Sequence, residues 1–248
     1  MYAAITARKR GYEVDLYEKE ERLGGTLWAA GMPTFKHDVL KLITYLERQC
    51  LKTGVNVYLN TEFTLKDAKK DYDKVILSAG SSPMMPPIPG IEKAGFVSEF
   101  LTDRKEAGKQ IVIIGGGLAG CEAACYLKEN AETVTIIEMQ EDILFGCDHC
   151  LNNDQALRQM LQDNNINKIT KATVTKIEDN RVTYLQDNQE YTIVCDTIIN
   201  AAGFKPNDQL EDALEEIYDD VTVIGDAKAP RKILTAIHEG YHAIRVME

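Results

Sequence analysis

The chain has 248 residues, of which 44% are hydrophobic and 27% are charged, and its formal net charge is −11. These values fit one or two ordinary globular domains, and they exclude a disordered chain, a collagen-like chain and a disulfide-stapled miniprotein. The acidic excess also argues against a nucleic-acid binder, because such proteins usually present a basic face to phosphate.

Short β-rich runs alternate with helical patterns along the whole chain. Strands are predicted for residues 12–17, 55–59, 74–79, 110–114, 133–138, 197–200 and 221–224, and helices for 38–52, 118–129, 156–161 and 233–247. Three further runs, 172–177, 181–185 and 191–194, alternate at period two with turn residues between them, which predicts a small antiparallel meander. The pattern favours an α/β fold with a mainly parallel sheet.

Neither a membrane anchor nor a secretory signal is expected. Apolar stretches such as residues 111–114 are far too short to span a bilayer. Arg8, Lys9 and Arg10 follow only a few apolar residues, so the start lacks the apolar core of a signal peptide. We therefore expect a cytoplasmic protein whose six cysteines are reduced thiols.

One segment of the chain repeats the pattern of another. Residues 121–138 can be laid over residues 1–18 without a gap, and Glu138 then falls on Glu18. Both copies read as helix, turn and strand with an acidic residue at the strand end. A glycine-rich loop precedes the second copy, whereas Met1 stands directly after the place of such a loop in the first. We therefore expect the chain to begin inside a βαβ unit that lacks its first strand and glycine loop.

That expectation has consequences for the first copy. The absent strand would leave the edges of strands 14–17 and 221–224 exposed, and exposed apolar edges invite pairing with another chain. The absent loop would also remove the backbone amides that hold a pyrophosphate. We expect weak FAD retention and self-association through the first domain, unless another segment fills the gap.

The second copy carries a dinucleotide-binding pattern. Gly115, Gly117 and Gly120 form G-x-G-x-x-G between a predicted strand and a predicted helix, and Glu138 ends the next strand. Gly115 permits a tight turn, Gly117 a close approach to pyrophosphate, and Gly120 close packing of helix on strand. Glu138 would accept hydrogen bonds from the ribose hydroxyls and repel a 2′-phosphate, which favours NADH over NADPH. The alternative is a glycine-rich turn without a ligand.

Several other short motifs fit a second nucleotide. Glu18 and the glycine pair after it suggest another adenosine site, and three apolar strands end in small residues where a cofactor could pass close to the backbone. The candidate residues of these motifs are Glu18, Gly24, Gly25, Ala79, Gly80, Gly203, Gly225 and Asp226. Each motif alone also fits a purely structural role.

Taken together, these motifs resemble the pyridine-nucleotide-disulfide-reductase-like flavoproteins. Within that group the chain looks most like the C-terminal FAD/NAD(P)H-binding half of the 2-enoate reductase and 2,4-dienoyl-CoA reductase family. The segments that carry the resemblance are 17–19, 23–25, 115–120 with Glu138, 148–149 with 152–153, 203–207, 225–226, 236–237 and 239–240. The resemblance covers essentially the whole chain.

The resemblance implies two Rossmann-like, three-layer dinucleotide-binding domains, one inserted in the other. Because the Gly225-Asp226 motif and the last helix belong with the first copy, we expect residues 1–103 plus 206–248 to form the FAD-type domain. Residues 104–205 would form the NAD-binding domain, which includes the meander.

The family further implies hydride transfer from NAD(P)H to FAD and electron transfer to a separate acceptor, which larger members carry in a barrel domain. Because the nicotinamide and the flavin carry this chemistry, no side chain is predicted to be catalytic. The alternative function is that of a truncated, flavin-free nucleotide-binding fragment without activity.

Two further motifs, H-E-x-x-H and C-x-x-C, have the spacing of metal-binding or redox sites. Residues 238–242 read H-E-x-x-H, with His238 and His242 spaced as in zinc hydrolases. Because the family pattern already accounts for Glu239, we expect an ordinary helix and no metal site there. Cys147 and Cys150 form a single C-x-x-C, for which we expect two free thiols rather than a redox pair.

Overall fold

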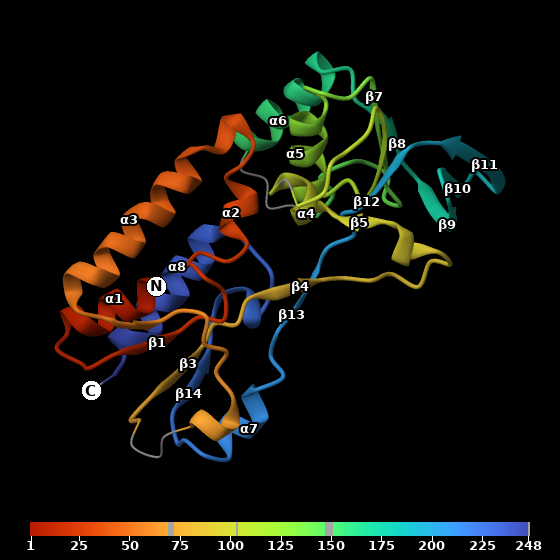
Figure 1. The fold of residues 1–248 in the computed structure, drawn as a ribbon. Coiled ribbons are helices and arrows are strands. Elements are labelled where there is room, and N and C mark those ends of the chain that lie inside the picture. The colour runs from red at the N-terminus through yellow and green to blue at the C-terminus, as the bar shows by residue number, and fades with distance from the viewer. Residues whose placement is uncertain (69–71, 103, 147–150, 248) are drawn as a thin grey trace. The chain divides into compact units, whose positions relative to one another are not determined.

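The computed structural model describes residues 1–68, 72–102, 104–146 and 151–247 (Figure 1). It is an α/β structure that divides into two compact units. Unit 1 comprises residues 1–28, 38–82 and 204–248, and unit 2 comprises residues 29–37 and 83–203. In the order of the chain, unit 2 is thus inserted between segments of unit 1.

A five-stranded parallel sheet forms the centre of unit 2, with the strand order β5-β12-β6-β7-β8. The strands are β5 (Gly95–Phe96), β6 (Gln110–Ile114), β7 (Thr133–Ile137), β8 (Asn167–Ile169) and β12 (Thr197–Asn200). In β6 and β7 every residue after the first is buried. Such continuous apolar strands are expected where a parallel sheet is covered on both faces.

Different layers cover the two faces of this sheet. Helices α4 (Val97–Leu101), α5 (Leu118–Leu127) and α6 (Leu151–Asp163) pack together on one face, and the meander lies on the other (Figure 1). The meander consists of β9 (Ala172–Glu178), β10 (Arg181–Gln186) and β11 (Gln189–Val194). A core cluster that contains Val112, Ile137, Val182 and Tyr184 joins it to the sheet.

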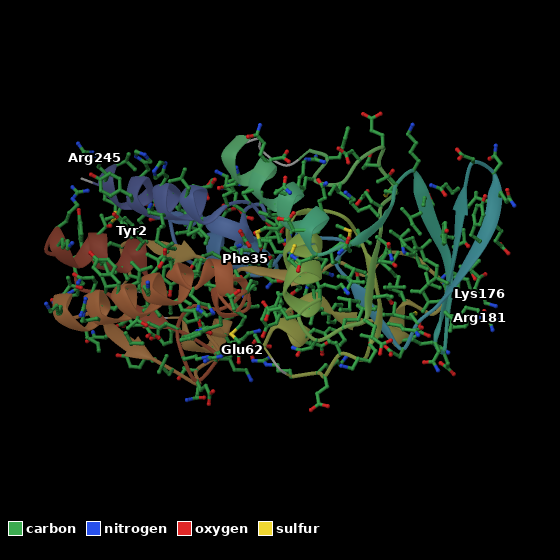
Figure 2. All side chains as sticks on the ribbon, turned by 90° about the horizontal axis from the view of Figure 1, so that it is seen from above. Tyr2, Phe35, Glu62, Lys176, Arg181 and Arg245 are labelled. Atoms are coloured by element: carbon green, nitrogen blue, oxygen red, sulfur yellow. The ribbon has the colours of Figure 1, made fainter. Side chains whose placement is uncertain are left out.

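The predicted antiparallel meander is confirmed, and its turns show why the sequence predicted it. Asp187 and Asn188 both have positive φ angles, of 51° and 59°, as the type I′ turn of a tight hairpin requires. Asn180, with φ of 60°, lies in the other turn. Figure 2 shows the side chains of Lys176 and Arg181 near that turn, and both are exposed.

Two short parallel strand pairs and a group of helices form unit 1. β1 (Asp15–Tyr17) pairs with β2 (Asn56–Tyr58), and β3 (Val75–Leu77) pairs with β14 (Val221–Val223). The main helices are α1 (Tyr2–Lys9), α3 (Asp38–Thr53) and α8 (Ile233–Arg245). α1 packs against both α3 and α8.

Small side chains let α1 and α8 approach closely. Ala3 and Ala7 of α1 share a core cluster with Ala243 and Ile244 of α8. On the other side, Ile5 shares a cluster with Leu46 and Cys50 of α3. Ile43, Leu46 and Cys50 are the buried residues of α3, and the 3.6-residue periodicity of the sequence predicts that face.

The remaining elements are short. They are α2 (Leu27–Ala30), α7 (Glu211–Glu215), the strands β4 (Ser81–Pro83) and β13 (Phe204–Pro206), and the 3₁₀ turns Thr34–Lys36, Leu65–Asp67, Ile91–Lys93 and Gly225–Ala227. β4 and β13 pair with each other where the chain enters and leaves the long segment of unit 2.

The boundaries of the units differ from the predicted domain ranges at residues 29–37, 83–103 and 204–205. Residues 29–37 and 83–103 belong to unit 2 in the structure, and residues 204–205 to unit 1. For residues 83–103 the reason is that β5 forms the edge of the five-stranded sheet beside β12, and Ile91 and Ala94 pack into the core beneath the meander. A strand of two residues carries no periodicity from which the sequence could assign it.

No helix within the described residues is both long enough and apolar enough to cross a membrane.

Candidate functional site

The glycine loop of unit 2 joins the end of β6 to the start of α5. Gly115 has a φ of +108°, and a Cβ atom on it would lie 2.5 Å from the carbonyl oxygen of Ala201. A Cβ atom on Gly120 would lie 2.1 Å from the carbonyl oxygen of Gly115. Both distances are far below any real contact, so the loop closes in this form only with glycine at these two positions.

Gly117 differs from the other two glycines of the motif. A Cβ atom on Gly117 would meet nothing within 4 Å, so this position faces open space. Gly117 is also the N-cap of α5, and no side chain caps the helix there. The free N–H groups and the helix dipole make such a terminus a site for an anion. The loop therefore fits a pyrophosphate, and a side chain at residue 117 would occupy its place.

Glu138 follows β7 and is fixed by the backbone around it. Its Oε2 accepts a hydrogen bond from the Gly116 N–H at 2.6 Å, and its Oε1 accepts one from the Gln140 N–H at 2.8 Å. Each carboxylate oxygen can accept more than one hydrogen bond, so the side chain is oriented and still able to accept. The structure thus brings Glu138 and the glycine loop together.

The end of β12 lies beside the same loop. The buried Asn200 donates to the carbonyl oxygen of Met84 at 2.9 Å and accepts from the Ala202 N–H at 3.0 Å. Gly203 follows, with φ of +110° and open space where its side chain would be. The small residues after β12 therefore leave room at the carboxyl ends of the strands.

In unit 1 the structure brings four predicted residues together. β3 and β14 are parallel neighbours, so Ala79 and Gly80 lie beside Gly225 and Asp226 at the carboxyl ends of the two strands. The Ser81 hydroxyl donates to the Asp226 carboxylate at 3.3 Å. Gly80 and Gly225 both have positive φ angles, of 72° and 63°. Ligands of open α/β sheets bind outside such strand ends.

Glu18 and the glycine pair lie at the end of the other strand pair of unit 1. Glu18 follows β1, and its Oε1 accepts the Glu20 N–H at 3.0 Å. Gly24 and Gly25 have φ angles of +112° and +50°, and a Cβ atom on Gly24 would lie 3.0 Å from both the Ile43 and Trp28 side chains. The pair thus forms a tight turn against α3.

Sequence analysis missed a half-buried ion pair in unit 2. Lys36 Nζ lies 2.7 Å from the Oε2 of Glu122, and the side chains are only 23% and 14% exposed. Burial raises the pKa of Glu122 above its ordinary value, although Lys36 acts in the opposite direction. Glu122 is the one charged residue of the otherwise apolar α5, and that isolation was the signal available in the sequence.

Glu239 is the acidic residue of the H-E-x-x-H motif, and its carboxylate is bound within unit 1. Its carboxylate accepts the Gly225 N–H at 2.7 Å and pairs with Arg231. Burial alone would raise the pKa of Glu239, but these two contacts outweigh it and hold the pKa below its ordinary value. Among the described residues, no group of three or more His, Cys, Asp or Glu side chains could hold a metal ion. Glu239 therefore shapes the turn before Asp226.

The C-x-x-C motif at Cys147 and Cys150 lies outside the described residues. The four cysteines that the structure describes are buried and free of disulfides.

One hollow of unit 1 contains none of the predicted site residues. It has a volume of about 570 Å³ and lies between α1, α3 and α8, with Tyr2 and Arg245 among its lining residues (Figure 2). Two arginines that line the hollow already donate hydrogen bonds at the end of α8. Arg10 donates to the Ile244 carbonyl oxygen, and Arg245 donates to the Tyr241 hydroxyl. The glycine loop and the strand ends remain the better candidates for a ligand site.

Three known proteins are similar to the chain over nearly its whole length. It is 33% identical to the cinnamate reductase of Clostridium sporogenes over 247 residues, which cover 99% of this chain and 37% of that protein. It is 35% identical to the NADH oxidase of Thermoanaerobacter brockii over 252 residues, with 97% and 38% covered. The solved structure of a 2-naphthoyl-CoA reductase in complex with 2-naphthoyl-CoA matches with a TM-score of 0.92 and 28% identity, covering 100% and 38%. The chain thus spans less than two fifths of each relative.

The family assignment rests on a match that extends over most of the chain. The model of the pyridine nucleotide-disulphide oxidoreductase family matches residues 1–237. The resemblance to the 2-enoate reductase group, which the motifs predict, is confirmed by the similarity to cinnamate reductase. The chain therefore belongs to the pyridine nucleotide-disulphide oxidoreductase family, whose members are oxidoreductases that bind FAD and NAD(P)H.

Proposed function

We propose that the chain is the FAD- and NADH-binding module of a larger reductase, in which unit 2 binds NADH and unit 1 binds FAD. The observation that carries the proposal is the glycine loop of unit 2. Two of its glycines are required by backbone contacts, the third faces open space, and Glu138 is hydrogen-bonded to the same loop. A pyrophosphate at the start of α5 would place the adenosine ribose toward the end of β7, where Glu138 stands.

The carboxylate of Glu138 favours NADH as the nucleotide. Its two oxygens are held by backbone N–H groups and retain lone pairs for the ribose hydroxyls. A 2′-phosphate would bring like charges together. Arg158, on the neighbouring α6, is paired with Asp142 and Asp154, so its charge is already neutralised. Both features support NADH over NADPH.

In unit 1, the proposed flavin site lies at the ends of β3 and β14, with Glu18, Gly24 and Gly25 as its adenosine end. Asp226 accepts hydrogen bonds from Ser81 and from the Arg231 N–H, and Glu239 holds the preceding turn. These contacts fix a carboxylate and two glycines at one edge, which suits a polar ligand that approaches the backbone closely. A bound flavin supplies the group that accepts the hydride of NADH.

The finer points of this function are also proposals. Because the chain spans less than two fifths of its relatives, we propose that electrons pass on to an acceptor outside these residues, in a barrel domain or another protein. We expect the module to work in the cytoplasm. The six scattered cysteines of the sequence support that expectation, because they fit reduced thiols better than a disulfide framework.

Purified protein supplied with FAD tests the proposal. We expect saturable but weak FAD binding in a fluorescence titration, and we expect NADH to reduce ferricyanide when excess FAD is present. Isothermal titration should give tighter binding of NADH than of NADPH. NADH binding without any flavin binding would favour the alternative of a flavin-free nucleotide-binding fragment. Binding of neither nucleotide would contradict the assignment of unit 2.

A further inference from the structure

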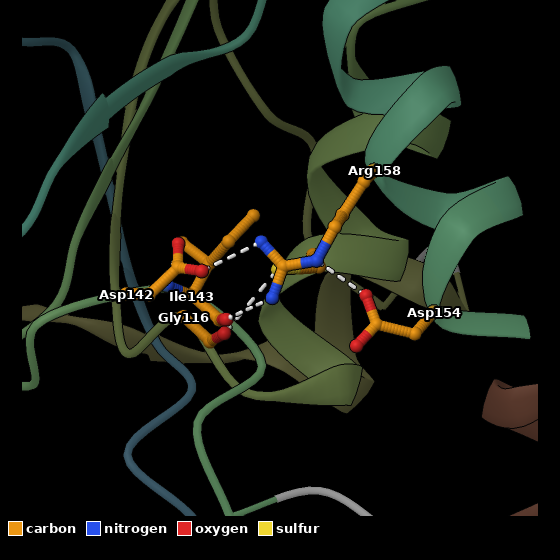
Figure 3. A network of polar contacts seen from close by, with 6 residues as sticks. Gly116, Asp142, Ile143, Asp154 and Arg158 are labelled. Atoms are coloured by element: carbon orange, nitrogen blue, oxygen red, sulfur yellow. Dashed lines mark hydrogen bonds and ion pairs between the residues drawn. The ribbon is translucent and has the colours of Figure 1, made fainter. Parts of the chain in front are cut away.

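Beside the proposed nucleotide site, one arginine contacts two neighbouring residues of a loop and one residue of its own helix at once. Arg158 of α6 donates from Nη1 to the Asp142 carboxylate at 2.8 Å and from Nη2 to the Ile143 carbonyl oxygen at 2.9 Å (Figure 3). Its Nε donates to Asp154, one turn earlier on the same helix. All the branches of the guanidinium are therefore used, and they fix the loop after β7 against α6.

The loop that Arg158 holds carries a residue in an unfavourable conformation. Leu144 has a φ of +59°, which leucine rarely adopts, and its side chain is buried. Such a conformation is strained and persists only where the surroundings impose it, often at ligand-binding sites. In this conformation the Leu144 N–H donates to the Gly116 carbonyl oxygen of the glycine loop at 2.7 Å.

Gly116 connects this loop to the proposed selectivity residue. Its carbonyl accepts from Leu144, and its N–H donates to Glu138. A Cβ atom on Gly116 would lie 3.0 Å from the side chains of both Glu138 and Ile143. The Gly116 peptide is therefore confined between the loop and the carboxylate. A relay of contacts runs from Arg158 through Ile143 and Leu144 to Gly116 and Glu138.

We propose that Arg158 is a positioning residue for nucleotide selectivity, which acts on Glu138 through the Leu144–Gly116 hydrogen bond. The proposal rests on NADH being the ligand of unit 2. Arg158 touches neither Glu138 nor the glycines of the motif, and no motif of the sequence marks it. Its side chain is 36% exposed, and ion pairs in such positions contribute little to stability, so its position in the relay explains it better than stability does.

The two nucleotides distinguish this role from a general structural one. If the loop merely supports the fold, its release by a substitution at Arg158 would weaken the binding of NADH and of NADPH equally. If the loop positions Glu138, its release would weaken the binding of NADH more, because only NADH has both the 2′- and the 3′-hydroxyl of the adenosine ribose free to donate to Glu138. We expect Arg158→Met to narrow the NADH preference by about two- to tenfold, the range that one hydrogen bond supplies.

The test measures dissociation constants of NADH and NADPH by titration calorimetry on the full chain. Arg158→Lys retains the charge but not the branched donor, so we expect partial rescue of the preference. Gln159→Ala is the matched control, since it removes an exposed hydrogen bond to Asp163 on the same helix without touching the loop. We expect it to leave both constants unchanged.

Three results would overturn the proposal. An unchanged preference in Arg158→Met, with far-ultraviolet circular dichroism like that of the wild type, would show that the relay does not act on Glu138. A wider NADH preference would instead mean that Arg158 contacts the 2′-phosphate of NADPH. If the wild-type chain binds neither nucleotide, the proposed function itself is contradicted. The wild type alone gives this result, so it is distinct from the results of the variants. If Arg158→Met does not fold, the ratio of the two dissociation constants in Arg158→Lys is compared with that of the wild type, and an unchanged ratio contradicts the proposal.

Discussion

Lys36 and Glu122 form an ion pair, 2.7 Å between Nζ and Oε2, in which both side chains are largely withdrawn from solvent. They lie 86 residues apart in the chain, and Glu122 comes directly after the first turn of the helix that starts at the glycine loop. Removing charges from water costs free energy that the attraction between them only partly returns. The two members of the pair should therefore respond differently to substitution.

We expect Lys36→Met to destabilise the protein more than Glu122→Gln at pH 7. The first change leaves an anion buried without its cation, which costs about 1.5–3 kcal/mol for a charged hydrogen bond. The second change puts a neutral amide of similar shape in place of the carboxyl group. Burial already raises the pKa of that carboxyl group, so less is lost when its charge is removed. Urea unfolding of both variants measures the difference, and equal losses would contradict it.

The same pair predicts a pH dependence. Because the pKa of Glu122 lies higher in the folded protein than its ordinary 4.5, the folded state binds more protons than the unfolded state above pH 4.5. The contribution of Glu122 to stability should therefore fall as the pH rises from 4.5 through the raised pKa. Urea midpoints across this range should decline less in Glu122→Gln than in the wild type. Parallel profiles would show that Glu122 does not titrate as described.

Two glycines of the loop should fail in different ways. Gly120→Ala places a Cβ atom 2.1 Å from a backbone oxygen and should strongly destabilise or prevent folding of unit 2. Gly117→Ala meets no atom of the protein and should fold normally, yet its methyl group would occupy the proposed place of the pyrophosphate. Circular dichroism combined with NADH titration separates the two effects. Normal NADH binding by Gly117→Ala would place the pyrophosphate elsewhere.

Glu138→Ala should lower the affinity for NADH and narrow its advantage over NADPH. The loss of charged hydrogen bonds to the ribose is worth about 1.5–3 kcal/mol, roughly ten- to a hundredfold in affinity. Titration with both nucleotides measures the change. An unaltered ratio of the two dissociation constants would mean that Glu138 only holds the Gly116 N–H.

Glu239 should matter more to unit 1 than its place in a zinc-like motif suggests. Glu239→Leu leaves the half-buried Gly225 N–H without its acceptor and should cost about 1–3 kcal/mol, whereas Glu239→Gln keeps an acceptor and should cost less. Because the pKa of Glu239 is lowered, its contribution is complete above pH 4.5 and is lost as the pH falls through the lowered value. Thermal unfolding at pH 7 and pH 4 compares the variants.

Much of the fold could be predicted because local patterns carry it. β6 and β7 are apolar runs beside turn residues, and the meander is marked by Asp187-Asn188, so their positions follow from the sequence alone. β5 could not be predicted, since two residues form a strand only through the partner that β12 supplies.

The candidate site also has features that the sequence predicts and contacts that it does not. The glycine spacing identifies the loop, and Glu138 follows from the end of the next strand. The pairing of Lys36 with Glu122, the contact of Glu239 with Gly225 and the relay from Arg158 each join residues distant in the chain or hidden in ordinary helices. Such contacts exist only in the folded protein, and no motif of this sequence marks them.

The packing of α1 on α8 has a consequence for the order of events during synthesis. The five-stranded sheet of unit 2 is complete once residue 200 has emerged from the ribosome, whereas Ala3 and Ala7 must wait for Ala243 and Ile244. Arg10 likewise meets its acceptor carbonyl 234 residues later. Domains usually fold in the order of their translation, and contacts so distant in sequence form slowly. α1 precedes unit 2 in the chain, yet its side that faces α8 should be among the last surfaces to reach its native neighbours, and a chaperone that binds nascent chains would meet that side uncovered.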